Sequence, residues 1–215
     1  KIEMAEVFVI MTGITATLKV EGKDSISVVK RVNEHSTNLS WILEVNSISR
    51  AYCNREISLK EAYDSLSKIK HKVYSSFENR MAVIGICIGF SIFFGGTLLD
   101  VYLTCLVGVC LSFCITIGEK LRFPQLFQDV FNGLGISVVS ILLNALIVVD
   151  MNMDLVIISS IMPLVPGVAI TTAVRDTLHG DYISGCARML EAFLKAAGIA
   201  IGIGIGIITL GSMLL

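Results

Sequence analysis

The chain is poor in charge, poor in proline and without a basic excess. Charged residues make up 16% of the chain against 54% hydrophobic residues, and the mean hydropathy is +0.77. So little charge excludes an ordinary soluble domain of this length. The formal net charge of -1 argues against nucleic acid as a partner, because nucleic-acid binding favours a basic stripe.

The six cysteines contain no CxxC pair, and the three histidines are far apart in the sequence. We therefore expect no metal site and no cofactor. Cys110 and Cys114 share one helical face, which indicates small apolar packing. Four of the six cysteines lie in expected membrane spans, so a disulfide framework is not indicated. No signal peptide is visible near Lys1.

The charges that are present gather at one end of the chain. Twelve of the 17 Lys and Arg residues fall within residues 1–80. This asymmetry predicts a polar domain over residues 1–78 and a membrane domain over residues 79–215. The expected fold class is an α-helical polytopic membrane protein preceded by a small cytoplasmic α/β domain with an antiparallel sheet.

In the polar part, residues 14–20 alternate apolar and polar side chains, which predicts a strand with one buried face. Residues 6–11 and 26–32 are further strand candidates, and the turn chemistry of residues 21–24 connects two of them. A small antiparallel sheet is the simplest interpretation.

Two helices are expected to follow the sheet. Ser58 and Glu61 form a capping box at the start of the second helix. The apolar faces expected to be buried are Trp41, Val45, Ile48 and Tyr52 in the first helix and Leu59, Ala62, Leu66, Ile69 and Val73 in the second. No catalytic constellation is visible here, so we interpret the domain as a scaffold or docking domain.

A helix that crosses about 30 Å of hydrocarbon needs about 20 apolar residues. By this criterion the membrane part contains five candidate spans. Pro124 prevents a continuous helix between the second and the third. The spans are expected at about residues 80–97, 101–118, 131–149, 154–174 and 187–214.

Basic residues are retained on the cytoplasmic side of membrane proteins, which predicts the topology. With residues 1–78 in the cytoplasm, the loops that carry Lys120, Arg122, Arg175 and Arg188 all face inward. The outward loops hold acidic residues and neither Lys nor Arg. With five spans, the C-terminus is expected outside a bacterial cytoplasmic (inner) membrane.

The last span carries glycine at four-residue intervals, at Gly198, Gly202 and Gly206. Glycine along one face allows close helix contact. We therefore expect this face to pack against another helix, within the subunit or in a partner.

The fourth span is interrupted by Pro163, Pro166 and Gly167. A proline inside a helix costs about 3 kcal/mol or more, and carbonyls one turn before it lose their partners. Discontinuous helices form the substrate sites of many transporters. Thr171 and Thr172 add hydroxyls nearby. A kink determined by packing alone is the alternative that the prolines leave open.

Charged residues follow the break directly. Arg175, Asp176 and Asp181 border the membrane, and Arg188, Glu191 and Lys195 follow at helical spacings that would allow Arg188–Glu191 and Glu191–Lys195 pairs. Such groups in a span normally face a partner or a wet cavity. The alternative is that they lie at the interface and snorkel to water.

The run Pro163–Gly167, followed by Arg175-Asp176, Gly180-Asp181 and Ser184-Gly185, resembles the bacterial threonine/serine exporter (ThrE-like) family. The resemblance extends over the whole chain, through residues 9–14, residues 54–58, Gly95-Gly96 and Asp100. It implies that the helix opening the family's cytoplasmic domain precedes residue 1.

The chain also ends after five spans, whereas fused family members carry a second membrane half. It is therefore similar to the larger subunit of the split form, which works with a second small membrane subunit. One such pair is associated with export of succinate and related dicarboxylates. The resemblance implies export of a small carboxylate-bearing metabolite, either a threonine/serine-type amino acid or a succinate-type dicarboxylate.

We accordingly expect a transporter subunit in the lipid bilayer, with a second small membrane subunit, as a homo-oligomer, or both, and with its site at the broken fourth span. Arg175, Arg188 or Lys195 would attract the carboxylate, and Asp176, Asp181 or Glu191 would couple transport to protons. These residues would otherwise brace the break. The rivals are an intramembrane protease using Asp100 and Asp181, which the opposite sides predicted for these residues disfavour, and a non-transporting membrane scaffold or assembly partner.

Overall fold

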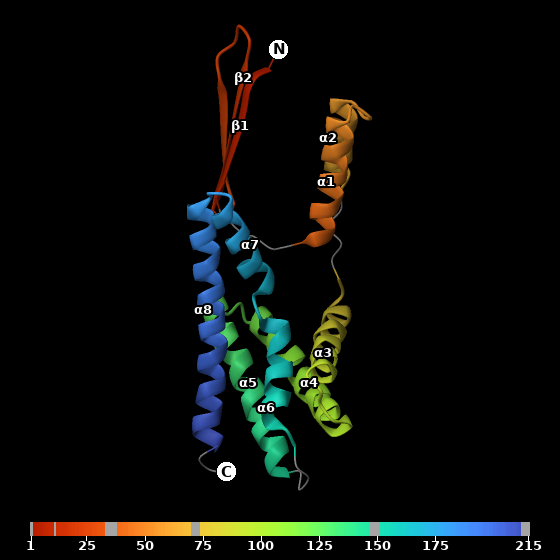
Figure 1. Cartoon of the computed structure of the whole chain (residues 1–215), viewed down its shortest axis with the longest axis vertical. Helices are drawn as coiled ribbons and strands as arrows, with labels where there is room; N and C mark the ends of the chain where they lie inside the picture. The colour runs from red at the N-terminus through yellow and green to blue at the C-terminus, as the bar shows by residue number, and fades with distance from the viewer. Residues whose placement is uncertain (1, 11, 33–37, 70–73, 147–150, 212–215) are drawn as a thin grey trace. The chain divides into compact units, whose positions relative to one another are not determined.

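A computed structural model describes residues 2–10, 12–32, 38–69, 74–146 and 151–211 (Figure 1). The chain forms two compact units that divide between residues 73 and 74, five residues before the boundary expected from the charge distribution. A small three-stranded antiparallel sheet precedes a mostly helical part, which confirms the predicted fold class.

Strands β1 (Ile2–Ile10), β2 (Gly13–Val20) and β3 (Ile26–Arg31) follow one another in the sheet in chain order. Both pairings are antiparallel, and the turn that ends β2 places Gly22 at a φ of 73°. All three predicted strands are confirmed, although Met11 and residues 33–37 lie outside the described residues. The predicted buried face is wrong, because none of the described sheet residues is buried.

Helices α1 (Leu39–Cys53) and α2 (Leu59–Lys68) contact each other as a helical hairpin. The predicted capping box is confirmed. The Glu61 carboxylate accepts the Ser58 backbone N–H at 2.7 Å, and the Ser58 hydroxyl accepts the Glu61 N–H at 3.3 Å. The apolar faces are not buried as expected, since among the described residues of this unit only Ala62 is buried. Val73 lies outside the described residues.

Among its described residues, the second unit contains four continuous helices long and apolar enough to cross a membrane. A fifth crossing is formed if the bent pair α6–η1 and α7 is one span, which agrees with the expectation of five spans. The helices are α3 (Ser76–Phe93), α4 (Leu98–Lys120), α5 (Gln125–Leu146), α6 (Met153–Ile161), the short 3₁₀ helix η1 (Met162–Leu164), α7 (Gly167–Leu178) and α8 (Tyr182–Gly206), which continues as the π-helical turn η2 (Ile207–Gly211).

The interruption predicted for the span at residues 154–174 is confirmed, because the prolines divide it into two helices at an angle of 60°. Two other helices begin earlier than the expected spans. Helix α5 begins at Gln125 instead of residue 131, and the last helix begins at Tyr182 instead of residue 187, while residues 212–214 lie outside the described part of the chain.

Capping and turn geometry account for where several helices begin. The Asp100 carboxylate accepts the Thr97 N–H at 2.9 Å with one oxygen and the Asn152 N–H at 3.0 Å with the other. This carboxylate therefore links the starts of α4 and α6, a structural use that leaves the protease interpretation without support from Asp100. Between α4 and α5 the chain turns through Arg122, whose φ of 54° ends the helix before Pro124.

The core of the second unit lies between α3, α4, α5, α6 and α8. Leu103, Val107 and Leu111 of α4 form its centre. Leu164 of η1 packs in the same cluster as Ile136 of α5, so the helix break reaches the core. Figure 1 shows α5 and α8 side by side over much of their lengths, with α7 beside the first half of α8.

Candidate functional site

The break between α6 and α7 is short and internally bonded. Pro163 lies within η1, Pro166 precedes α7, and Gly167 is its first residue. The Met162 carbonyl, one turn before Pro166, accepts the Val165 N–H at 3.3 Å, and the Val165 carbonyl accepts the Gly167 N–H at 2.8 Å. The expectation that the carbonyl before Pro166 is free is therefore wrong, because the 3₁₀ turn supplies it with a donor.

Thr171 and Thr172 lie one turn beyond the break, and both hydroxyls bond to α7 itself. The Thr171 hydroxyl donates to the Gly167 and Val168 carbonyls at 3.0 Å, and the Thr172 hydroxyl donates to the Val168 carbonyl at 2.8 Å. Their hydrogens are thus used inside the helix, and what they offer a solute is the lone pairs of the hydroxyl oxygens.

Helices α7 and α8 form a tight hairpin that carries the charged part of the motif. Gly180 turns the chain with a φ of 90°, and the Asp176 carbonyl accepts the Asp181 N–H at 2.9 Å. Gly185 of α8 packs directly against Ala173 and Thr177 of α7, where a side chain would not fit. The Asp181 side chain is exposed at the start of α8 and makes no capping bond there.

Asp176 is the charged centre of this hairpin. Its carboxylate lies 3.1 Å from the Arg188 Nε and 3.7 Å from an Arg175 nitrogen, and its side chain is 17% exposed. The Arg188 Nε does not have hydrogen-bond geometry, so the contact is an ion pair held by charge. The sequence spacing allows Arg188 to pair with Glu191, and the structure shows that Arg188 also pairs across the hairpin with Asp176. Arg175 is 68% exposed.

The other predicted charged residues lie further along α8. Glu191 and Lys195 are half-buried, and the Lys195 charge acts on Asp129 of α5. The structure therefore brings Arg175, Asp176 and Arg188 together in the α7–α8 hairpin.

The glycines of α8 lie in the interface between α5 and α8. Gly198 contacts Asp129 and Leu126, Gly202 contacts the backbone of Val130, and Gly206 contacts Ser137. In return, Gly133 of α5 lies against the Ile199 carbonyl. The two backbones approach so closely along this line that side chains at these positions would collide.

Four buried polar residues of α5 and α6 escaped the sequence analysis. Asp129 and Asn132 of α5 and Ser159 and Ser160 of α6 are each at most 4% exposed, and each has a side-chain oxygen without a hydrogen-bond partner. Asp129 was missed because the third span was expected to begin at residue 131, which placed this residue in a loop. The sequence feature that could have identified it is the occurrence of Asp129, Asn132 and Gly133 within about one turn of an otherwise apolar helix.

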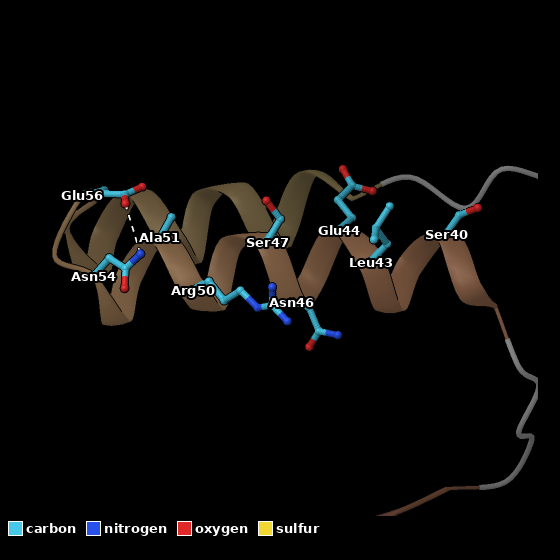
Figure 2. Close-up of a pocket in the computed structure, with 9 residues that line it drawn as sticks. All are labelled: Ser40, Leu43, Glu44, Asn46, Ser47, Arg50, Ala51, Asn54 and Glu56. Carbon is cyan, nitrogen blue, oxygen red and sulfur yellow. Dashed lines mark hydrogen bonds between the residues drawn. The ribbon is translucent and has the colours of Figure 1, made fainter. Parts of the chain in front are cut away.

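Hollows lie on the surfaces of both units. An apolar groove of about 540 Å³ runs between Ile170 of α7 and the Cys186–Ala196 stretch of α8. A hollow of about 870 Å³ runs along α1, with charged and polar residues among those that line it and with Asn54 and Glu56 hydrogen-bonded at one end, as Figure 2 shows. Within the described parts of the chain, no group of three His, Cys, Asp or Glu residues could hold a metal ion.

Comparisons with known proteins point to a family of exporters. The chain is 21% identical over 200 residues to a protein of Mycobacterium tuberculosis named "Probable threonine/serine exporter". That alignment covers 90% of this chain and 37% of the relative, so the chain spans little more than a third of the relative's length. No solved structure matches the chain. A family model described as "Putative threonine/serine exporter" matches residues 1–210, and the chain therefore belongs to this ThrE exporter family.

Proposed function

We propose that the chain is one subunit of a secondary transporter that exports a small carboxylate-bearing metabolite, a threonine/serine-type amino acid in the first place. The observation that carries the proposal is the membrane helix broken by 60° at residues 162–167, followed directly by the charged α7–α8 hairpin. Membership of the exporter family supports a transporter of this type. A succinate-type dicarboxylate is the alternative substrate that the carboxylate chemistry allows.

Arg175 is the residue best placed to receive the substrate carboxylate. Its side chain is 68% exposed, and its contact with Asp176 is long at 3.7 Å. A guanidinium offers a bidentate fork that matches a carboxylate. Arg188 is already held at 3.1 Å from Asp176. We therefore assign Asp176 and Arg188 to bracing the hairpin and Arg175 to the substrate.

The break itself supplies the polar atoms that a solute needs in a membrane. Pro163, Pro166 and Gly167 fix the 60° bend, and α7 begins at Gly167 with N–H groups that have no partner within the helix. The lone pairs of Thr171 and Thr172 lie one turn further on. Together these groups form a polar site next to an apolar core, as in other transporters with broken helices.

We further propose that the N-terminal unit and the α7–α8 turn face the cytoplasm of a bacterium and that the C-terminus lies outside. The support is the distribution of Lys and Arg over the loops. We also propose that a second small membrane subunit completes the transporter, as the resemblance to the split form of the family implies.

Efflux from membrane vesicles tests the substrate and the role of Arg175. Vesicles that contain the full transporter are loaded with labelled threonine or labelled succinate, and efflux is followed with and without an excess of the other compound. Arg175→Gln is expected to slow threonine efflux about tenfold or more, because one charge-assisted contact is worth about 1.5–3 kcal/mol.

Lys120→Gln is the matched control, since Lys120 is an exposed cation at the end of α4, a different helix from those of the break and the α7–α8 hairpin. It should leave efflux unchanged. Equal efflux from wild type and Arg175→Gln would refute the assignment of Arg175. Absence of flux from reconstituted liposomes that contain both subunits would favour a scaffold.

A further inference from the structure

Asp129 lies one turn into α5 and is the only acidic residue of that helix. It is 4% exposed, and Asn132, one turn further along the same face, is 2% exposed. Asp129 Oδ2 and Asn132 Oδ1 each expose less than 1 Å² and have no hydrogen-bond partner. Both atoms are acceptors as placed, so this face of α5 holds two buried acceptors that lack a donor.

Helix α8 closes over this face without leaving room for a solute. A Cβ added at Gly198 would lie 3.1 Å from the Asp129 Cβ and 3.3 Å from the Leu126 carbonyl oxygen. Gly202, one turn further along, lies against the backbone of Val130. Because Asp129 Oδ2 is inaccessible to a water-sized probe, neither an ammonium group nor a hydrated cation reaches it in this packing. A proton on the Asp129 carboxyl group itself is the remaining donor, because it needs no room for a further heavy atom.

Among the charged residues around α5, Lys195 is the one that affects Asp129. The charged residues on helices packed against α5 are Asp100, Glu119 and Lys120 on α4, Asp154 on α6, and Arg188, Glu191 and Lys195 on α8. Of these, Lys195 is the one whose charge acts on Asp129. The thiol of Cys114 on α4 lies beside Gly135, two turns away from Asp129 along α5.

We propose that Asp129 is the proton-carrying residue of the transporter, protonated while α5 and α8 are packed as described and deprotonated when they separate. The proposal rests on the proposed export function and assigns its coupling to a residue outside the α7–α8 hairpin. In the packed state the carboxyl proton turns Oδ2 into a donor, next to the unpaired Asn132 Oδ1 on the same helix face.

On separation, Asp129 gives its proton to water and becomes a carboxylate. Water then solvates that carboxylate, because the separation uncovers the face of α5 that α8 covers in the packed state. Only one O–H bond breaks and one O–H bond to water forms, and no further reactant is needed. Packing of α5 against α8 therefore favours the protonated acid, and separation of the two helices favours the carboxylate. This dependence of the protonation state on the conformation is what couples transport to protons.

Asp129→Asn tests the proposal, because an amide has the shape of the protonated acid and supplies a donor without releasing a proton. In proteoliposomes that contain the full transporter, threonine exchange at equal pH should stay within about threefold of wild type. Threonine movement driven by a pH gradient, and proton movement driven by a threonine gradient, should both be lost. Asp154→Asn, an exposed aspartate at the start of α6, is the control and should keep both.

An infrared spectrum of the full transporter separates this proposal from the proposed function. The C=O stretching band of a protonated carboxyl is expected in the wild type and in Asp154→Asn, and it should be missing in Asp129→Asn. A spectrum without that difference, or gradient-driven transport by Asp129→Asn at the wild-type rate, would overturn the proposal. If the wild type moves no threonine in either mode, the proposed substrate is refuted, while the infrared band still decides whether Asp129 holds the proton.

Discussion

The two units of the chain are stabilised in different ways. In the second unit, helices far apart in the sequence bury a shared core, and α5 and α8 approach until glycine backbones touch. In the first unit, Ala62 is the single buried residue among those described, and local hydrogen bonds define the strands and helices. Packing between distant helices therefore stabilises the second unit, whereas hydrogen bonds between strands and at helix ends stabilise the first unit.

This difference indicates where a substitution should matter. In the second unit one added side chain at a close contact displaces two whole helices, since the backbones cannot yield. In the first unit a change removes one local bond and leaves the rest in place. The expected effects should therefore decrease from the α5–α8 contact, through the α7–α8 hairpin, to the capping box of α2.

Gly202→Leu should have the largest effect. A side chain at Gly202 meets the backbone of Val130 and Leu134, so α5 and α8 must separate, at a cost of about 3 kcal/mol or more. Thermal unfolding in detergent, followed by the loss of monodisperse protein, measures this cost. Gly204→Leu is the matched control because nothing lies within 4 Å of its Cβ position. Equal losses for the two variants would show that the α5–α8 contact is not specific.

Gly180→Ala should have the next largest effect. The φ of 90° at Gly180 is unfavourable for any residue with a Cβ, so the substitution should lower the free energy of unfolding by about 1–2 kcal/mol. Gly89→Ala in α3 provides a control of opposite sign, since its Cβ position is open and helical. The free energy of unfolding of that variant should rise by up to about 1 kcal/mol, because alanine is the better helix former. A stability loss in both variants would contradict the turn argument.

Asp176→Asn should weaken the hairpin by a smaller amount. The Arg188–Asp176 pair is partly exposed, with Arg188 40% accessible, so its loss should cost at most about 1 kcal/mol. The cost should shrink as salt rises, because salt screens such pairs. Thermal unfolding at two salt concentrations, with Asp181→Asn as an unpaired exposed control, measures it. A salt-independent loss would mean that Asp176 acts through packing.

The elements of this fold were predictable wherever a local rule determines them. Alternation gave the strands, the Ser58–Glu61 spacing gave the capping box, and the prolines gave the break in the fourth span. The buried faces of the first unit were not predictable in the same way, since periodicity reports which face is apolar and not what covers it. Trp41 and Tyr52 illustrate this, at 36% and 43% exposure.

The candidate site was predictable only in part. The sequence motif identified the charged hairpin, but not that Arg188 pairs with Asp176 on another helix, because that pairing depends on how α7 folds back on α8. Asp129 was missed for a related reason. Its burial comes from Gly198 of α8, almost 70 positions away, and a hydropathy window over α5 carries no information about that contact.

Acidification should produce the smallest effect, confined to the start of α2. The Glu61 carboxylate accepts the Ser58 N–H and hydroxyl, and these bonds lower its pKa from the ordinary value of 4.5. Since the folded pKa is the lower one, the cap contributes fully above pH 4.5 and its contribution is lost as the pH falls through the lowered value. Amide hydrogen exchange at Ser58 should therefore lose protection in acid, after correction for intrinsic exchange rates. Glu61→Gln cannot titrate and should show no such step at Ser58. A step of equal size in Glu61→Gln would place the acid-sensitive group elsewhere, and unfolding of the whole first unit at the same pH would show that its stability is less local than its contacts indicate.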